Sequence, residues 1–148
     1  MLLEILIGGS ETISVAMRWA ILLLARHPEV QRKMQKEIDA HFGKKRPSYI
    51  SDKENLTYCE AVIYEILRVS TVQSWIIRRT SADVDVLGHR IPRDSLVMPN
   101  FLAMHRDPTV WPDPQNFNPN NFFEEETNSL KRANSMVTFS LGMISATP

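Results

Sequence analysis

The stretch HRDPTVWPDPQNFNPNNF, residues 105–122, decides the fold of this chain. Its proline and asparagine residues recur every few positions, and such residues mark turns. Aromatic side chains, Trp111, Phe117 and Phe122 among them, stand between these turns. A loop longer than about 15 residues is usually either functional or disordered. Because aromatic residues favour order, the stretch predicts a long, ordered meander.

The segment just before the meander predicts a short β hairpin. Its sequence is DVDVLGHRIPRDSLVMPN, residues 83–100, in which apolar and polar residues alternate with the period of a strand. Gly88 lies between the two halves of this pattern and supplies the turn. Most of the nine prolines follow residue 90, so we expect less regular structure in the second half of the chain than in the first.

Two helices are predicted between residues 28 and 70. The first, PEVQRKMQKEIDAHFG, has Pro28 in its first turn and ends at Gly43. Ser51 and Glu54 match a capping box, and the second helix, NLTYCEAVIYEILRVS, follows at once.

The second of these helices carries an apolar face and one charged pair. Six apolar residues recur along it at spacings of three and four: Leu56, Cys59, Val62, Ile63, Ile66 and Leu67. The single cysteine is therefore predicted to be a small core residue, and one cysteine allows no internal disulfide. Glu65 and Arg68 stand three residues apart, and on an exposed face such a pair contributes only about 0.2–0.5 kcal/mol.

The first 30 residues, MLLEILIGGSETISVAMRWAILLLARHPEV, predict a long helix that is buried on most sides. Glu4, Glu11 and Arg18 interrupt the apolar run that a membrane span requires. Glu4 also stands where a secretory signal has basic residues. The sequence thus predicts neither a span nor a signal peptide. No capping residue precedes this helix, so we expect the chain to be truncated at this end.

Two glycines inside the first helix allow two interpretations. In one, the residues GGSETIS form a capping signal for a helix that begins near Ser10. In the other, Gly8 and Gly9 weaken the helical ladder so that another group packs against its backbone. An acid, Glu11, and an alcohol, Thr12, stand beside that opening.

Composition and charge argue against several classes of function. The 148 residues suffice for one domain, and 17 basic and 17 acidic side chains give no net charge. That balance argues against nucleic-acid binding and against attraction to anionic lipid. The tripeptide His-Arg-Asp at 105–107 lacks the asparagine that follows it in a kinase catalytic loop. The sequence has no zinc-protease pair, Gly-rich phosphate loop or nucleophile elbow.

In their order and spacing these motifs resemble one family, the cytochromes P450, which are haem-thiolate monooxygenases. The motifs are a Gly-Gly-x-Glu-Thr helix, a Glu-x-x-Arg helix, a hairpin with Ile-Pro, the meander and a final FSLG. They are most similar to the C-terminal third of the microsomal animal type, over residues 1 to about 142. The resemblance implies a mainly α fold with a small β hairpin. Residues 1–148 would be part of a single P450 domain, from the long distal helix through the meander, incomplete at both ends.

The resemblance also implies an activity. The intact protein would insert one oxygen atom of O2 into a small apolar organic substrate. It would use haem b and two electrons from an NADPH-dependent reductase. It would be held at the endoplasmic reticulum membrane by an N-terminal helix that this chain lacks.

Roles for two pairs of residues follow from the resemblance. Gly8 and Gly9 would lie over the distal haem face, where dioxygen binds. Glu11 and Thr12 would form the acid–alcohol pair that delivers protons there, as in general acid catalysis.

Other residues of the resemblance surround the haem and the substrate. Glu65 and Arg68 would form a buried ion pair on the proximal side, and buried charges are costly unless they are paired. Either Arg78 or Arg79 would meet a haem propionate. Segment 69–80 would line the substrate pocket, with Val72 and Ile76 as contacts. The family usually has an arginine where Asn121 stands, and an asparagine brings a hydrogen bond without a charge.

The end of the chain departs from the family's ligand loop, Phe-x-x-Gly-x-Arg-x-Cys-x-Gly. Phe139 and Gly142 match its haem-binding start, but Ile144 replaces the arginine, Ala146 the cysteine and Pro148 the last glycine. The axial ligand of the family is a cysteine thiolate, which Ala146 cannot replace. We therefore expect no metal ligand here and no activity from the chain alone. The alternative is a non-catalytic isoform or pseudogene product that acts as an interaction module.

Overall fold

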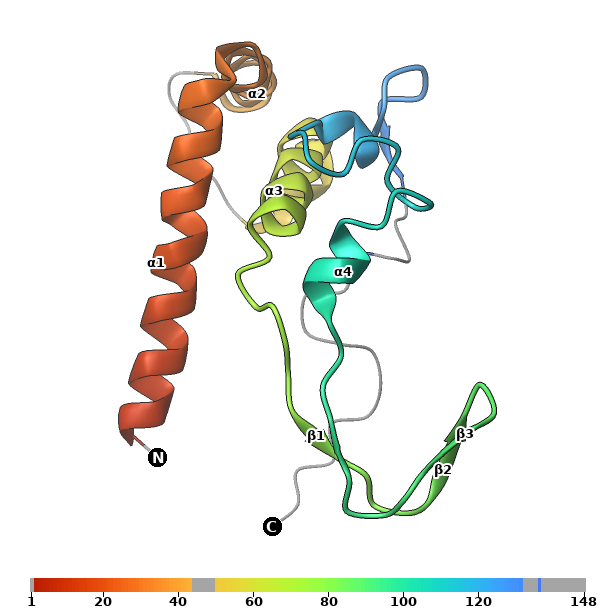
Figure 1. Cartoon of the computed structure of the whole chain (residues 1–148). Helices are drawn as coiled ribbons and strands as arrows, with labels where there is room; N and C mark the ends of the chain where they lie inside the picture. The colour runs from red at the N-terminus through yellow and green to blue at the C-terminus, as the bar shows by residue number, and fades with distance from the viewer. Residues whose placement is uncertain (1, 44–49, 132–135, 137–148) are drawn as a thin grey trace.

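The computed structural model describes residues 2–43, 50–131 and 136 of the chain (Figure 1). Helices fill the first half, and short strands joined by loops fill most of the second, as the sequence predicts. The helical elements are α1 (Leu2–Arg26), α2 (Pro28–Phe42), η1 (Ile50–Asn55), α3 (Thr57–Ser70), α4 (Phe101–His105) and η2 (Pro119–Asn121). The strands form antiparallel pairs. They are β1 (Arg78–Arg79) with β4 (Leu96–Val97), β2 (Val84–Val86) with β3 (His89–Ile91), and β5 (Phe123–Glu124) with β6 (Ser129–Leu130).

Helix α3 lies at the centre of the molecule, between α1 on one side and the meander on the other (Figure 1). It is the helix whose apolar residues recur at helical spacing, and it supplies the buried Ala61, Val62 and Ile66. The meander covers it with aromatic rings, as the sequence of residues 105–122 predicts. The rest of this core is Leu23, Val30, Tyr58, Trp111, Phe117, Phe122 and Phe123.

The predicted limits of α2 are confirmed at both of its ends. Pro28 occupies the first turn of α2, where its missing N–H is not needed. Gly43 follows Phe42 with a φ of 60°, a left-handed value that glycine adopts without strain. Its backbone N–H donates to Asp39 O at 3.0 Å.

The start of α3 corrects the predicted capping box. Ser51 and Glu54 belong to η1, and α3 begins only at Thr57. The residue before it, Leu56, offers no side-chain cap. The cap comes instead from α2: the Glu37 carboxylate accepts the N–H of Tyr58 at 2.9 Å and that of Cys59 at 2.8 Å. A side chain 21 and 22 residues earlier in the chain thus satisfies amide groups that local sequence leaves open.

The predicted hairpin is β2–β3, which extends away from the helices (Figure 1). Leu87 and Gly88 form its turn, with φ values of 53° and 83°, as a two-residue hairpin of the primed type requires. The Asp85 carboxylate accepts the N–H of Gly88 at 2.9 Å. The turn at Gly88 is therefore confirmed.

Two predicted burials are wrong for this chain. Helix α1 is not buried on most sides, because Leu6, Ile13 and Ile21 are each more than 60% exposed. Leu23 is its one buried residue among the side chains that the structure describes. In α3, Ile63 is 52% exposed, although its spacing assigns it to the apolar face.

Candidate functional site

A cavity of about 220 Å³ separates α1 from the end of α3. Its wall is mostly apolar and comes from three parts of the chain. Helix α1 contributes Thr12, Ile13 and Ala16. The other lining residues are Leu67 of α3, Thr71, Val72 and Gln73 of the loop that follows it, and His105 of α4. Two predicted site residues, Thr12 and Val72, therefore meet at one cavity although 60 positions separate them.

The Thr12 hydroxyl is bonded to its own helix. Its Oγ1 donates to Gly8 O at 2.7 Å, one turn earlier. Residues four apart lie on the same helix face, so Gly8 and Thr12 face the same side of α1. A Cβ added at Gly8 or Gly9 would meet no atom of the described residues within 4 Å. The space over this turn of α1 is thus open to another group.

The glycine pair does not start a helix. Helix α1 runs from Leu2 through Gly8 and Gly9 to Arg26, so the interpretation as a cap near Ser10 is wrong. The side chain of Ser10 instead donates to Leu6 O within the helix. Glu11 is adjacent to Thr12 in sequence, but its side chain is exposed. Of the acid and the alcohol, only the alcohol is among the residues that line the cavity.

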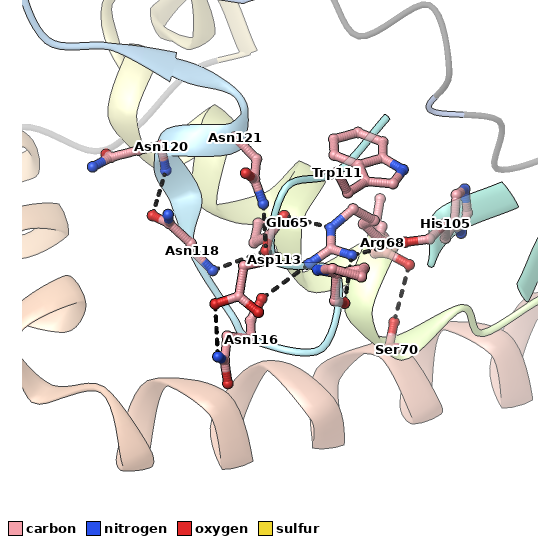
Figure 2. Close-up of polar contacts among 12 residues, drawn as sticks. Glu65, Arg68, Ser70, His105, Trp111, Asp113, Asn116, Asn118, Asn120 and Asn121 are labelled. Atoms are coloured by element: carbon pink, nitrogen blue, oxygen red, sulfur yellow. Dashed lines mark hydrogen bonds and ion pairs between the residues drawn. The ribbon is translucent and has the colours of Figure 1, made fainter. Parts of the chain in front are cut away.

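Glu65 and Arg68 form a fully buried ion pair (Figure 2). Arg68 Nε donates to Glu65 Oε2 at 2.8 Å, and Arg68 Nη2 donates to Oε1 at 2.7 Å. This is the two-pronged geometry in which arginine binds a carboxylate most strongly. The pair is therefore not the weak, exposed ion pair that its i,i+3 spacing alone would indicate.

Arg68 also binds the meander. Its Nη1 donates to the carbonyls of His105 at 2.8 Å and Pro114 at 2.9 Å, and its Nη2 donates to Asn116 O at 3.1 Å. Together with the bonds to Glu65, these use all five N–H donors of the guanidinium. The guanidinium carbon lies 5.2 Å from the centre of the Trp111 ring, so the charge also gains a cation–π contact.

Glu65 accepts two further hydrogen bonds from the end of the meander (Figure 2). The backbone N–H of Asn118 donates to Oε1 at 2.8 Å, and Asn121 Nδ2 donates to the same oxygen at 3.1 Å. Asn121 thus does join the cluster, as an uncharged donor. Glu65, Arg68 and Asn121 fix α3 and the meander as one unit.

The remaining predicted residues lie apart from this cluster. Arg78 and Arg79 form β1, opposite Val97 and Leu96 of β4, and both are exposed. Successive side chains of a strand point to opposite faces, so a group on one face of this ribbon would meet only one of them. Ile76 is half-buried and, in the part of the chain that the structure describes, is not a lining residue of the cavity.

Cys59 is a core residue, as predicted. It is 6% exposed, and its Sγ lies 3.8 Å from Met34 O. Burial, with a smaller effect of the Glu37 carboxylate, raises the pKa of this thiol to about 12. It therefore stays protonated near neutral pH, and a protonated thiol is a poor metal ligand. Within residues 2–43 and 50–131, His, Cys, Asp and Glu side chains nowhere gather in a group of three that could hold a metal ion.

Three predictions concern residues outside the described ones: Phe139, Gly142 and Ala146. In the described part of the chain, none of the helices combines the length and the hydropathy that crossing a membrane requires.

Several residues of the cavity were not identified from the sequence. Ala16 follows Thr12 by one helical turn, so the i,i+4 period could have placed it on the same face. Leu67 was assigned only to the apolar face of its helix. Thr71 and Gln73 lie in segment 69–80, which the resemblance assigns to the substrate pocket without naming either residue. No local pattern marks His105, because the fold alone brings it to α1.

Comparison of the sequence with known proteins shows the family of the chain. The family described as Cytochrome P450 matches residues 1–143. Among curated proteins, the chain is 36% identical to Cytochrome P450 2J3 of Rattus norvegicus and 34% identical to Cytochrome P450 2J2 of Homo sapiens, each over 95% of this chain and 28% of the relative. It is 38% identical to a steroid 17-alpha-hydroxylase/17,20 lyase of Ictalurus punctatus, over 83% of this chain and 24% of the relative. The chain thus spans about a quarter of the length of the curated relatives it matches.

Proposed function

The chain belongs to the cytochrome P450 family, and from this membership we propose that it forms the oxygen-side helix, the ion-pair cluster and the meander of a haem-dependent monooxygenase. The intact protein would insert one oxygen atom of O2 into a small apolar organic substrate. Two electrons would come from an NADPH-dependent reductase. The observation that carries the proposal is the cavity that joins Thr12 to Val72.

The cavity suits an apolar substrate. Its exposed wall is mostly apolar, and its polar groups come from four side chains: Thr12, Thr71, Gln73 and His105. Substrate pockets are typically apolar with a few polar groups that fix orientation. Val72 would contact the substrate directly. Ile76 would act one layer further out, through the backbone of the segment that carries both.

Thr12 would hold and pass a proton at its Oγ1. Its hydroxyl now donates to Gly8 O at 2.7 Å, a bond that it can exchange by rotation about one side-chain torsion. Thr12 could then donate toward the open space over Gly8 and Gly9. Glu11, which is exposed, would exchange protons with solvent on the outer side of the helix. This division of labour is that of a general acid relay.

The described residues fit a haem only in part. The open space over Gly8 and Gly9 would receive the flat ring, and Arg78 or Arg79 would pair with a propionate. When bound, the haem supplies the oxygen-activating chemistry. We propose that these residues do not provide the iron ligand, because Cys59 is a buried, protonated core thiol and Ala146 stands in the ligand position of the loop that Phe139 and Gly142 begin. We therefore propose that the 148 residues alone are inactive.

Location and partners follow from the family in the same way. We propose that the intact protein is held at the endoplasmic reticulum membrane. The balanced charge of the chain favours no nucleic-acid partner.

The first test is a long-read sequence of the transcript on both sides of these codons. We expect a frame that reaches an arginine and a cysteine shortly after Gly142. The polypeptide encoded by that frame should bind haem and give the carbon monoxide difference band of a thiolate ligand, and the 148-residue chain is its matched control. A stop codon directly after Pro148 in an abundant transcript would instead support the non-catalytic interaction module.

A further inference from the structure

The short helix α4 braces one wall of the cavity. At its start, the N–H of Phe101 donates to Ser74 O at 3.1 Å, and Asn100 pairs with Trp75 in an isolated β-bridge. At its end, His105 reaches Thr71. The segment from Thr71 to Trp75, which supplies part of the cavity wall, is therefore tied to α4 at both ends.

Thr71 has an unusual backbone conformation. It ends α3 with φ 39° and ψ 53° and is 4% exposed. A β-branched residue is an outlier in this left-handed region, where glycine usually ends a helix. Such a conformation persists only when the surrounding structure holds it in place. The neighbours of the Thr71 side chain should therefore be the groups that hold it.

The hydrogen bonds of Thr71 determine which atom of His105 carries the proton. Thr71 Oγ1 donates its one proton to Arg68 O at 2.8 Å. It also lies 3.2 Å from His105 Nδ1. Because the hydroxyl proton is already used, this second bond requires an N–H on Nδ1. The neutral ring is then the Nδ1–H tautomer.

His105 is fixed from its backbone as well as from its ring. Its carbonyl accepts from Arg68 Nη1 at 2.8 Å (Figure 2), and the residue is 1% exposed. Arg68 in turn is anchored by Glu65. The chain of contacts from Glu65 through Arg68 to His105 thus ends at Thr71, on the cavity wall.

We infer that His105 is a positioning residue: its Nδ1–H holds the left-handed turn at Thr71, and that turn sets where Val72 and Gln73 stand in the cavity. The identification of this cavity as a substrate pocket rests on the proposed function, whereas the contact between His105 and Thr71 does not. His105 therefore acts on the shape of the cavity wall that Thr71, Val72 and Gln73 form. Thr12 lies across the cavity, on α1.

The unmodified protein provides the first test. Nitrogen-15 NMR of the imidazole, recorded on the polypeptide that carries residues 1–148, distinguishes the two neutral tautomers. We expect the proton of His105 on Nδ1, with a through-bond correlation to Thr71. A ring protonated on Nε2 alone would overturn the inference, and this result needs no variant that could fail to fold.

Matched variants provide the second test, with benzene as the probe. An apolar cavity of about 150 Å³ is large enough to bind benzene. Thr71→Val and His105→Leu both remove the hydrogen bond between Thr71 and His105 and keep the approximate shape of the side chain. Thr71→Val also removes the bond to Arg68 O. Thr71→Ser keeps the hydroxyl, and His105→Asn keeps an N–H near the Nδ1 position. Binding is followed through the methyl signals of Val72.

We expect the dissociation constant for benzene to rise about 3- to 10-fold in Thr71→Val and His105→Leu, the usual effect of one hydrogen bond. In Thr71→Ser and His105→Asn it should change by less than about twofold. The double variant should be no worse than Thr71→Val alone, because that change already removes the bond to His105. Additive losses, or unchanged binding in all four variants, would contradict the inference.

The two proposals fail in different ways. If the polypeptide binds no haem, the proposed function fails, while the tautomer and the benzene affinities still decide the role of His105. If haem binds and the four variants behave alike, only the role of His105 fails. In an active haem protein, His105→Leu should raise KM and change the ratio of products, with a smaller effect on kcat.

Discussion

The carboxylate of Glu65 and the guanidinium of Arg68 face each other through two parallel hydrogen bonds of 2.7 and 2.8 Å, and no solvent reaches either side chain. Around this pair the rest of the cluster is arranged, because each donor of Arg68 that does not bind Glu65 binds a meander carbonyl. Two charges that would be costly apart in an apolar interior thus hold a loop that has little regular structure of its own.

Removal of one partner of this pair should be severe. We expect Arg68→Ala to lower the free energy of unfolding by about 3–5 kcal/mol, because it leaves the Glu65 carboxylate buried without its counter-charge. Arg68→Lys should recover only part of this loss, since a lysine cannot form the two-pronged contact. Urea unfolding followed by circular dichroism measures both.

The matched control is the exposed pair Arg90–Asp83 on the β2–β3 hairpin, with an N–O distance of 2.6 Å. Arg90→Ala should change the unfolding midpoint very little, because solvent screens exposed ion pairs. If Arg68→Ala and Arg90→Ala lowered the free energy of unfolding equally, burial of the Glu65–Arg68 pair would not strengthen its contribution to stability.

Asn121 should contribute through its amide N–H. We expect Asn121→Leu to destabilise the fold by about 1–3 kcal/mol, the usual cost of leaving a buried acceptor short of a partner. Asn121→Asp, which keeps the shape, should be worse, because it places a second carboxylate beside Glu65. Thermal unfolding of the two variants ranks them, and the reverse order would show that shape matters more than charge here.

The Glu37 carboxylate should stabilise the start of α3 through its hydrogen bonds. Glu37→Ala removes both acceptors of the Tyr58 and Cys59 amides, and we expect a loss of about 1 kcal/mol, typical of an N-terminal cap. Glu37→Gln keeps one acceptor and should lose less. Hydrogen exchange at the amides of residues 58 and 59 should accelerate in Glu37→Ala and remain slow in the central turns of α3.

Cys59 should make stability depend on pH in the alkaline range. Its pKa is raised from 9.0 to about 12, first by burial and then by Glu37. A raised pKa means that the folded state keeps the proton, so the contribution to stability is complete below pH 9 and is lost as the pH rises toward 12. The steepest loss is about 1.4 kcal/mol per pH unit.

Comparison with Cys59→Ala isolates this effect from other groups that titrate in the same range. The difference in unfolding free energy between the two proteins should be constant from about pH 7 to pH 8 and should shrink above about pH 9. Alkylation of the native thiol should also be much slower than in urea. Rapid alkylation of the folded protein would contradict the burial.

Thr12 should matter for turnover more than for folding. In the haem-binding polypeptide, we expect Thr12→Ala to lower product formation about 100-fold, the usual effect of losing a general acid. Thr12→Ser, which keeps the hydroxyl, is the control. The fold should tolerate Thr12→Ala, because alanine is the better helix former by roughly 0.5 kcal/mol. A normal rate in Thr12→Ala would exclude the relay.

Much of the secondary structure could be predicted because it depends on residues close together in the chain. Pro28 and Gly43 mark the limits of α2, and Gly88 marks the turn of the hairpin. Cys59 was predicted as a core residue, and it is buried. The two wrong burials have one cause: Ile63 and the exposed residues of α1 have the right period, but the period does not say which neighbours cover them.

The sequence by itself determined the helices, the hairpin turn and the aromatic meander, since φ preferences and apolar spacing act within a few residues. It also determined the family, through the order of its motifs. Only the tertiary structure decided which carbonyls accept the hydrogen bonds of Arg68 and which helix caps α3. It also decided that Thr12, Val72 and His105 share one cavity. A hydrogen bond or a cavity wall needs groups that are close in space, and the packing of α1, α3 and the meander alone brings these groups together.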